Sequence, residues 1–201
     1  IYHTGDTNTR LNFGTDTLLL EAGGNCGVQI NSGSVIVNQN AGSVNFRVEG
    51  DTDAALLMAN AATNKVGIGT TSPLGKLHVR SANAGSFTYD TNADDLIVES
   101  NANGGITVAT AAANTSRVIF ASPDDATGGE ISFNQTAKLM KIGPTTADGL
   151  LALQSANGVE TMRLDASNNV GIGTTSPSDT LTINNDNHLL LGLDAPAGND
   201  A

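Results

Sequence analysis

The sequence predicts an all-β protein built from short strands, and three observations support this prediction. Apolar residues occur in short runs that alternate with polar residues, which is the pattern of half-buried strands. Turn-forming clusters separate these runs about every ten residues, as in all-β architectures. One stretch, residues 66–73, returns letter for letter at 170–177. A supersecondary unit that recurs in this way indicates a repetitive or fibrous architecture.

The alternating runs place the predicted strands. In residues 45–49, for example, Phe46 and Val48 alternate with polar residues. The same period of two occurs in the runs 96–99, 106–108, 118–120, 131–133, 139–142, 162–164 and 181–183. Between the runs lie clusters of Gly, Pro, Asn and Asp, which favour turns. These clusters are 49–51, 101–105, 123–125, 143–144 and 184–186.

Two segments offer a helical alternative. Residues 53–62 are rich in Ala and Leu and fit one or two helical turns, but alignment with 161–165 favours a strand over 56–59. Residues 110–114 contain three consecutive alanines, and we expect them to form a loop of small residues.

The repeated stretch reads Val-Gly-Ile-Gly-Thr-Thr-Ser-Pro in both copies, which lie 104 positions apart (170 − 66). An apolar-polar-apolar triplet follows each copy, at 77–79 and 181–183. The segments 56–60 and 161–165 precede the copies and align if the first copy carries one extra residue. The unit therefore predicts a strand, a polar turn, a Gly-rich hinge, a Pro stop and a second strand.

A third, degenerate copy lies upstream, where residues 17–28 align without gaps on 161–172. The spacing of the three copies is uneven: 40 residues separate Gly27 from Gly67 (67 − 27), and 104 separate Gly67 from Gly171 (171 − 67). This unevenness argues against a regular solenoid and favours copies of one motif separated by β segments of variable length.

Six residues of the two intact copies form the predicted structural hinge: Gly67, Gly69, Pro73, Gly171, Gly173 and Pro177. Glycine allows unusual φ values or a close backbone approach, and proline ends strand pairing. A dinucleotide-binding loop would need a third Gly or Ala followed by a helix. Ser72 and Pro73 stand there instead, so we predict no nucleotide cofactor.

Composition excludes several classes of function. The net charge of −11 and the pI of about 4.3 disfavour nucleic acids and anionic membranes, which proteins bind mainly through Lys and Arg. The longest purely apolar run, 54–59, is too short to cross a membrane. The single cysteine, Cys26, rules out an intramolecular disulfide and is expected to be a small buried residue. Because the chain begins at Ile1 rather than Met, we expect a fragment or a processed product.

The polar residues form no recognisable catalytic or metal motif. The histidines His3, His78 and His188 are scattered, and Ser72 and Ser176 belong to turns. The acidic residues Asp51, Asp53, Asp94, Asp95, Asp124, Asp125 and Glu130 complete no calcium-loop spacing. We therefore predict no catalytic, cofactor-binding or metal-binding residue, and leave open a weak cation at a subunit interface.

The composition also suits a core shared between chains. Aromatic residues make up 3% of the sequence, Trp is absent, and there are 23 glycines. A monomeric β-sandwich usually fills its core with large side chains, aromatics among them. Small residues suit a thin core in which several copies wrap around a common axis, and pairing between chains would also remove open sheet edges.

The repeat residues carry a resemblance to a known family. The segments 64–73 and 169–177, together with Lys76-Leu77-His78-Val79, resemble the Val-Gly-Ile-Gly-Thr-x-x-Pro and Lys-Leu-His-Val motif of bacteriophage tail-fibre and tail-spike shafts. The segments 1–9, 129–134 and 160–165 also resemble parts of those fibres. The resemblance implies an elongated homotrimeric fibre, wound as a triple β-helix or built of intertwined β-prism or sandwich segments.

The same resemblance implies a non-enzymatic role in the virion. It implies host-cell attachment, with other tail or baseplate proteins and a cell-surface glycan or protein receptor as partners. The polar loops 101–105 and 184–188 are the predicted receptor contacts. We expect a degenerate β segment at 1–32, a module at 33–79 that ends in the first hinge, a larger module at 80–183 that ends in the second, and a new segment at 184–201.

Two other functions remain open. The chain could be a subunit of a bacterial extracellular filament, adhesin or contractile-injection-system fibre, which keeps the fibrous fold. It could also be a polysaccharide depolymerase carried on a spike. In that case Asp125→Asn or Glu130→Gln would abolish the release of reducing sugar from capsule.

Overall fold

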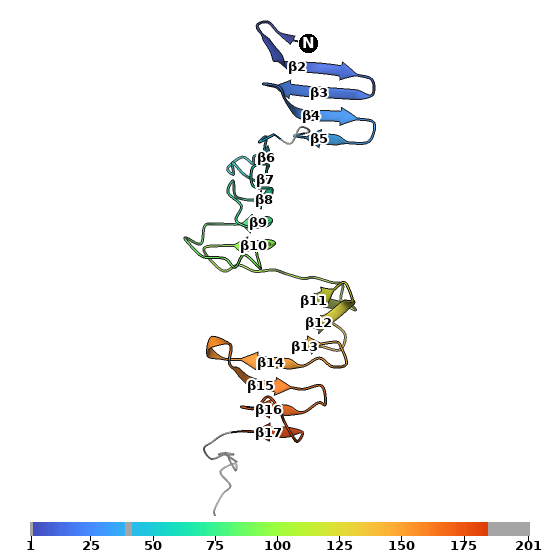
Figure 1. Cartoon of the computed structure of the whole chain (residues 1–201), viewed down its shortest axis with the longest axis vertical. Helices are drawn as coiled ribbons and strands as arrows, with labels where there is room; N and C mark the ends of the chain where they lie inside the picture. The colour runs from blue at the N-terminus through green and yellow to red at the C-terminus, as the bar shows by residue number, and fades with distance from the viewer. Residues whose placement is uncertain (1, 39–41, 185–201) are drawn as a thin grey trace, which may run out of the picture. The chain divides into compact units, whose positions relative to one another are not determined.

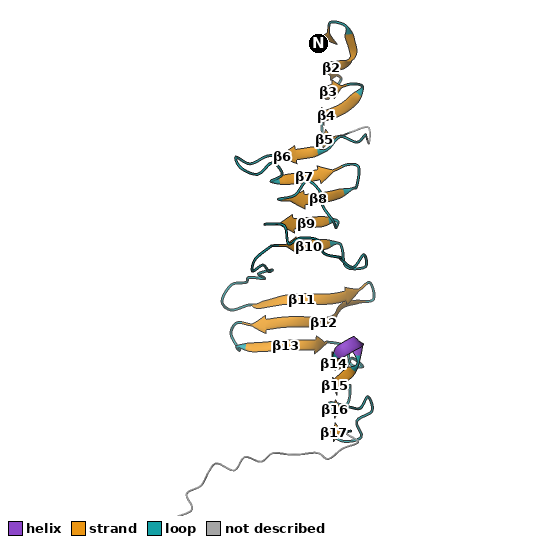
Figure 2. Ribbon diagram, turned by 90° about the vertical axis from the view of Figure 1, so that its left-hand side faces the viewer, coloured by secondary structure: helices purple, strands orange, loops and turns teal. Residues whose placement is uncertain are grey.

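A computed structural model describes residues 2–38 and 42–184, and this part of the chain is all-β (Figure 1). The predicted fold class is therefore confirmed at that level. Strands β1–β17 form four sheets, and within each sheet strands that follow one another in sequence are neighbours. In the described residues the only helical element is η1 (Ala156–Gly158), a short turn drawn purple in Figure 2.

The chain divides into two compact units, Ile1–Ile106 and Thr107–Ala201. The first unit contains a sheet of strands β1–β5 and a sheet of strands β6–β10. The second unit contains a sheet of strands β11–β13 and a sheet of strands β14–β17. In this order, we call the four sheets the first, second, third and fourth sheet.

The first sheet is an antiparallel meander. Its strands are β1 (Tyr2–His3), β2 (Asp6–Gly14), β3 (Thr17–Ala22), β4 (Asn25–Asn31) and β5 (Val35–Val37). Gly23 and Gly24 form the turn between β3 and β4, with φ of 59° and 79°. A two-residue hairpin turn with both φ values positive matches the twist of the flanking strands and favours glycine.

The second sheet changes direction within the repeat. Strands β6 (Phe46–Val48), β7 (Leu57–Asn60) and β8 (Lys65–Ile68) are antiparallel neighbours. Strands β9 (Leu77–Arg80) and β10 (Leu96–Glu99) then continue parallel to β8. The segments 69–76 and 81–95 are therefore crossover connections, and neither contains a helix.

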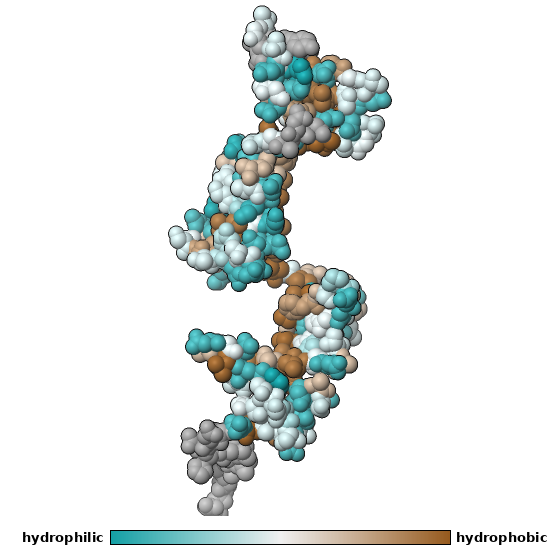
Figure 3. All heavy atoms as spheres, viewed as in Figure 1, coloured by the Kyte–Doolittle hydropathy of each residue, from teal (hydrophilic) through white to brown (hydrophobic). Residues whose placement is uncertain are grey.

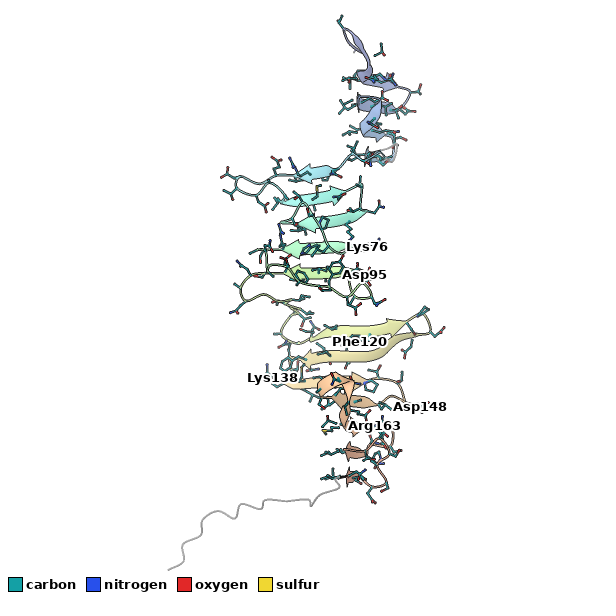
Figure 4. The ribbon with its side chains drawn as sticks, turned by 60° about the vertical axis from the view of Figure 1, so that its left-hand side comes forward. Lys76, Asp95, Phe120, Lys138, Asp148 and Arg163 are labelled. Carbon is teal, nitrogen blue, oxygen red and sulfur yellow. The ribbon has the colours of Figure 1, made fainter. Side chains whose placement is uncertain are left out.

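The second unit repeats this organisation. The third sheet is the antiparallel set β11 (Thr115–Ser122), β12 (Asp125–Asn134) and β13 (Leu139–Pro144). The fourth sheet has β14 (Leu151–Gln154), β15 (Glu160–Leu164) and β16 (Val170–Ile172) antiparallel, with β17 (Leu181–Ile183) parallel to β16. Figure 4 shows Lys138, which has a φ of 54°, at the turn between β12 and β13.

The predicted strands coincide with observed strands, or with parts of them, to within one residue at each end, with one exception. Residues 106–108 alternate correctly but form no strand, because no neighbouring strand offers them a hydrogen-bonded partner in the described chain. The turn predicted at 143–144 is also wrong, since both residues pair at the end of β13. The turn predicted at 184–186 lies almost entirely outside the described residues. No helix forms over 53–62, where the strand runs over 57–60.

Strand pairing confirms the alignment of the two intact repeats. Ala59 pairs with Val66, and Leu164 pairs with Val170, so the two hairpins match if the first turn holds one extra residue. The degenerate copy is also a hairpin, formed by β3 and β4, but a bulge at Leu20 and Glu21 shifts its register.

The turn of the second repeat hairpin is held by a carboxylate. The Oδ1 atom of Asp165 accepts hydrogen bonds from the backbone N of Ser167 at 2.9 Å and of Asn169 at 2.8 Å. The bond from the Asn169 backbone lowers the pKa of Asp165. In the first copy Asn60 takes this place, and its Oδ1 accepts from the backbone N of Ala62 at 3.0 Å.

We predict that Asp165→Asn makes the fourth sheet less sensitive to acid. A carboxyl whose folded pKa is depressed adds stability above its unfolded pKa of about 3.9, and this stability is lost as pH falls through the folded pKa. Near neutral pH the wild type should therefore have a higher melting temperature than Asp165→Asn. This difference in melting temperature should disappear as the pH is lowered through the folded pKa of Asp165. Thermal melts from neutral to acidic pH measure the difference in melting temperature. Asp51→Asn is the control, because Asp51 is exposed. A difference that does not change with pH would contradict the prediction.

Candidate functional site

One face of every sheet carries a strip of apolar side chains. Side chains alternate between faces along a strand, so residues two apart share a face. In the second sheet, pairing aligns one row of Phe46, Ala59, Val66, Leu77 and Leu96. The second row, two residues away along each strand and therefore on the same face, consists of Val48, Leu57, Ile68, Val79 and Val98.

The other three sheets have the same strip, again with two apolar residues from each strand. The first sheet contributes Leu11, Phe13, Leu18, Leu20, Val28, Ile30, Val35 and Val37. The third contributes Val118, Phe120, Ile131, Phe133, Met140 and Ile142. The fourth contributes Leu151, Leu153, Met162, Leu164, Val170, Ile172, Leu181 and Ile183. We call these four sets the apolar strips.

The apolar strips are open in the single chain. Phe13 is 69% exposed, Phe120 60% and Ile142 56%. Figure 3 shows hydrophobic side chains at the surface beside β11–β13, and Figure 4 labels Phe120 on β11. Among the described residues only Cys26, Ala55, Met58 and Ile97 are buried hydrophobics. Monomeric soluble proteins rarely expose large apolar patches of this kind.

The repeated stretch builds the same crossover twice. Its first three residues belong to β8 and β16, and the rest opens the connection to the next, parallel strand. Val66 N donates to Lys76 O at 2.8 Å, and Val170 N donates to Thr180 O at 2.8 Å. Ser72 N donates to Thr70 Oγ1 and Ser176 N to Thr174 Oγ1, each at 3.2 Å. The two identical stretches therefore make the same local hydrogen bonds.

The glycines allow the crossover to lie against the sheet. A Cβ atom on Gly67 would lie 2.4 Å from Thr70 O, and one on Gly171 would lie 2.6 Å from Thr174 O. Gly69 and Gly173 have φ of 72° and 69°, a region that favours glycine. Pro73 is buried and Pro177 half-buried in the same connections. The predicted hinge role of all six residues remains a prediction.

The face opposite the strip of the second sheet contains a buried polar pair. His78 Nδ1 accepts a hydrogen bond from Leu74 N at 3.3 Å, which leaves the proton of a neutral ring on Nε2. Nε2 lies 2.8 Å from Glu99 Oε2, within ion-pair distance but without hydrogen-bond alignment. Both side chains are less than 5% exposed. Sequence reasoning missed this pair, and the only signal was a polar residue between Leu77 and Val79.

In the second repeat, the same position holds Thr182. Its Oγ1 accepts from the backbone N of Ser178 at 3.1 Å and of Asp179 at 3.2 Å. One side-chain acceptor at the centre of the strand after the crossover therefore orders the crossover in both copies, whether it is an imidazole or a hydroxyl.

Arg163 ties the second crossover to its sheet. It donates to both carboxylate oxygens of Glu160 at 2.7 Å and to Thr175 O at 2.9 Å. Hydrogen bonding within this pair raises the pKa of Arg163 and lowers the pKa of Glu160. Figure 4 places Arg163 on β15.

The other polar candidates are dispersed. Asp53 and Asp125 each accept a backbone N–H from two residues ahead, at 2.8 Å and 2.9 Å, which is turn chemistry. Glu130 lies on β12, where its Oε1 accepts from Ser132 Oγ at 2.9 Å. The structure describes no group of three or more His, Cys, Asp or Glu residues that could hold a metal ion.

Other sequence predictions can be located in the chain. Cys26 is buried, as predicted. The loop 101–105 is exposed. His188 and most of the loop 184–188 lie outside the described residues. Over the described part, no helix is long and apolar enough to cross a membrane.

Fold and site together define a class of protein: an all-β chain of short-stranded sheets, each with one apolar strip left open. No model of a known protein family matches the sequence, and a search of curated proteins finds none that matches it.

We predict that Gly171→Ala destabilises the second unit by about 1–3 kcal/mol, because the added methyl group would overlap the Thr174 carbonyl. Gly105→Ala is the matched control, since nothing lies within 4 Å of a Cβ atom placed there. Thermal melts followed by circular dichroism measure both variants. Equal melting temperatures for the two variants would show that the close approach is not required.

Proposed function

We propose that this chain is a non-enzymatic segment of a homotrimeric, elongated fibre, in which three copies bury their apolar strips around a common axis. The observation that carries the proposal is the regularity of the strips. Every strand from β2 to β17 presents two apolar residues on the open side of its sheet.

Strip width favours three chains. Two residues spaced by two positions cover about 7 Å along a strand, and a strand of four residues spans about 13 Å. Three such strands can form a triangle whose height is close to the spacing of about 10 Å between packed sheets. Side chains from all three strips would then meet at the centre, whereas two strips packed face to face would leave their flanks open.

The remaining surface supports the same arrangement. The chain carries a net charge of −11, so three copies carry −33 (3 × −11). A strong charge of one sign keeps an assembly soluble and opposes lateral aggregation. In a parallel trimer the same residue of all three chains would lie at each level of the axis. Val66 would therefore meet Val66 of the other two chains and not a polar residue.

We further propose that the fibre belongs to a bacteriophage tail and serves attachment to host cells. The support for this step is the resemblance of residues 64–79 and 169–177 to tail-fibre shafts. The partners would be other tail or baseplate proteins and a glycan or protein receptor on the cell surface.

A bacterial extracellular filament, adhesin or contractile-injection fibre is the second candidate, because open apolar strips would serve a polymer equally well. Negative-stain electron microscopy of the purified protein distinguishes the two. Discrete rods of uniform length favour a tail-fibre segment, and filaments of indefinite length favour the polymer.

We predict that light scattering after size exclusion gives a mass of about 61 kDa, three times the chain mass of 20.4 kDa. The expected reason is burial of the apolar strips, worth about 25 cal/mol for each Å² removed from water. A mass of one chain would exclude the trimer under those conditions.

We also predict that Ile142→Lys abolishes association, because three copies would place a lysine against the axis at that level. The matched control is Lys141→Thr on the same strand, since its side chain lies on the opposite face. Light scattering should give the single-chain mass for Ile142→Lys and the trimer mass for Lys141→Thr. Trimers from both variants would contradict the assigned interface.

A further inference from the structure

We propose that a pocket on β9, β10 and the crossover 81–95 binds a neutral, hydroxyl-rich ring, such as one hexose unit of a glycan. This site deepens the adhesive part of the proposed function and rests on it only for its biological setting. The pocket has a volume of about 310 Å³, at the small end of the range of about 300–1,000 Å³ for ligand sites. A single ring suits this size.

The pocket wall combines one aromatic ring with planar polar groups. Phe87 lines the pocket and is 43% exposed, so part of its ring is accessible to a ligand. Beside it lie Arg80, Asn83 and Glu99. An aromatic ring has a negative face that attracts the C–H groups on the flat side of a sugar. Arginine donates, carboxylate accepts and an amide does both, so these groups can bind hydroxyls around the ring edge.

The polar groups are held before any ligand arrives. Glu99 Oε1 accepts from Ala84 N at 2.7 Å, and His78 Nε2 lies 2.8 Å from Glu99 Oε2. Asn83 Oδ1 accepts a hydrogen bond from Gly85 N at 2.8 Å, and this bond fixes the orientation of the Asn83 amide group, whose nitrogen can donate to a ligand. Side chains fixed in this way lose less conformational entropy on binding.

The charges in the pocket favour a neutral ligand. Arg80 Nε makes one long hydrogen bond, 3.4 Å, to Gly69 O, and no carboxylate of the described residues forms an ion pair with its guanidinium. Glu99 stands beside it, because Arg80 and Glu99 are paired in the β9–β10 register. An anion would be repelled by Glu99 and a cation by Arg80, whereas hydroxyl groups can bind both.

The pocket would stay open in the proposed trimer. Arg80 and Glu99 alternate with Val79 and Val98, which belong to the apolar strip. Their side chains therefore lie on the opposite face of the second sheet. Burial of the strip between chains would therefore leave the pocket on the opposite face uncovered.

Saturation-transfer difference NMR on the full chain tests the proposal. The probes are the methyl α-glycosides of D-glucose, D-galactose and N-acetyl-D-glucosamine, each added alone. At least one should receive saturation from the protein, strongest at the ring protons that face Phe87. Phe87→Ala should weaken its binding about tenfold, which is about 1.4 kcal/mol, and Asn83→Ala should weaken it less.

The matched control is Tyr89→Ala in the same crossover, because Tyr89 does not line the pocket. Its binding should equal that of wild type. Phe87 and Asn83 are both exposed, so neither substitution should prevent folding. The absence of saturation transfer to all three glycosides, or an affinity that Phe87→Ala leaves unchanged, would overturn the proposal.

Light scattering on the same samples separates this proposal from the proposed fibre. A trimer that binds none of the glycosides overturns the pocket and leaves the fibre standing. A single-chain mass with Phe87-dependent binding supports the pocket and contradicts the trimer.

Discussion

Burial of the apolar strips is the constraint on which the rest of this structure depends. No second layer of the described chain packs on these strips, so strip residues such as Phe13 and Ile142 are exposed to solvent in the single chain. Folding usually obtains its stability from such surface. In the second and fourth sheets the crossovers lie on the opposite face, whereas the strip face stays open in the single chain. In the proposed trimer, burial of the strips between chains would supply the missing stability.

The repeated crossover explains how so short a connection joins parallel neighbours. Parallel strands usually need a dozen or more connecting residues, whereas 69–76 and 173–180 have eight (76 − 68 and 180 − 172). Glycines at positions where a Cβ atom would overlap a backbone carbonyl let the connection lie flat on the sheet. The side chain of His78 or Thr182 then orders it from below. The motif is therefore a device for adding a parallel strand without a helix.

The two faces of the second sheet differ in chemical character. The strip face is uniform, which suits contacts between identical chains. The opposite face holds His78, Arg80 and Glu99 beneath the crossovers. This difference follows from alternation along each strand, because neighbouring residues point to opposite sides. If both proposals hold, trimer assembly and ligand binding would use different faces of this sheet and would not compete.

The sequence by itself determined the features that depend on neighbouring residues. Alternation at Phe46 and Val48 or at Leu181 and Ile183 predicted strands and one apolar side, and the repeat predicted two matching hairpins. Tertiary structure alone decided the choice of partners: the parallel β8–β9 pair, the bulge at Leu20 and the meeting of His78 with Glu99 across 21 residues (99 − 78). Residues 106–108 show why, since an alternating pattern becomes a strand only where another backbone lies in hydrogen-bonding register. Side-chain period is a local property, whereas register is set between distant segments.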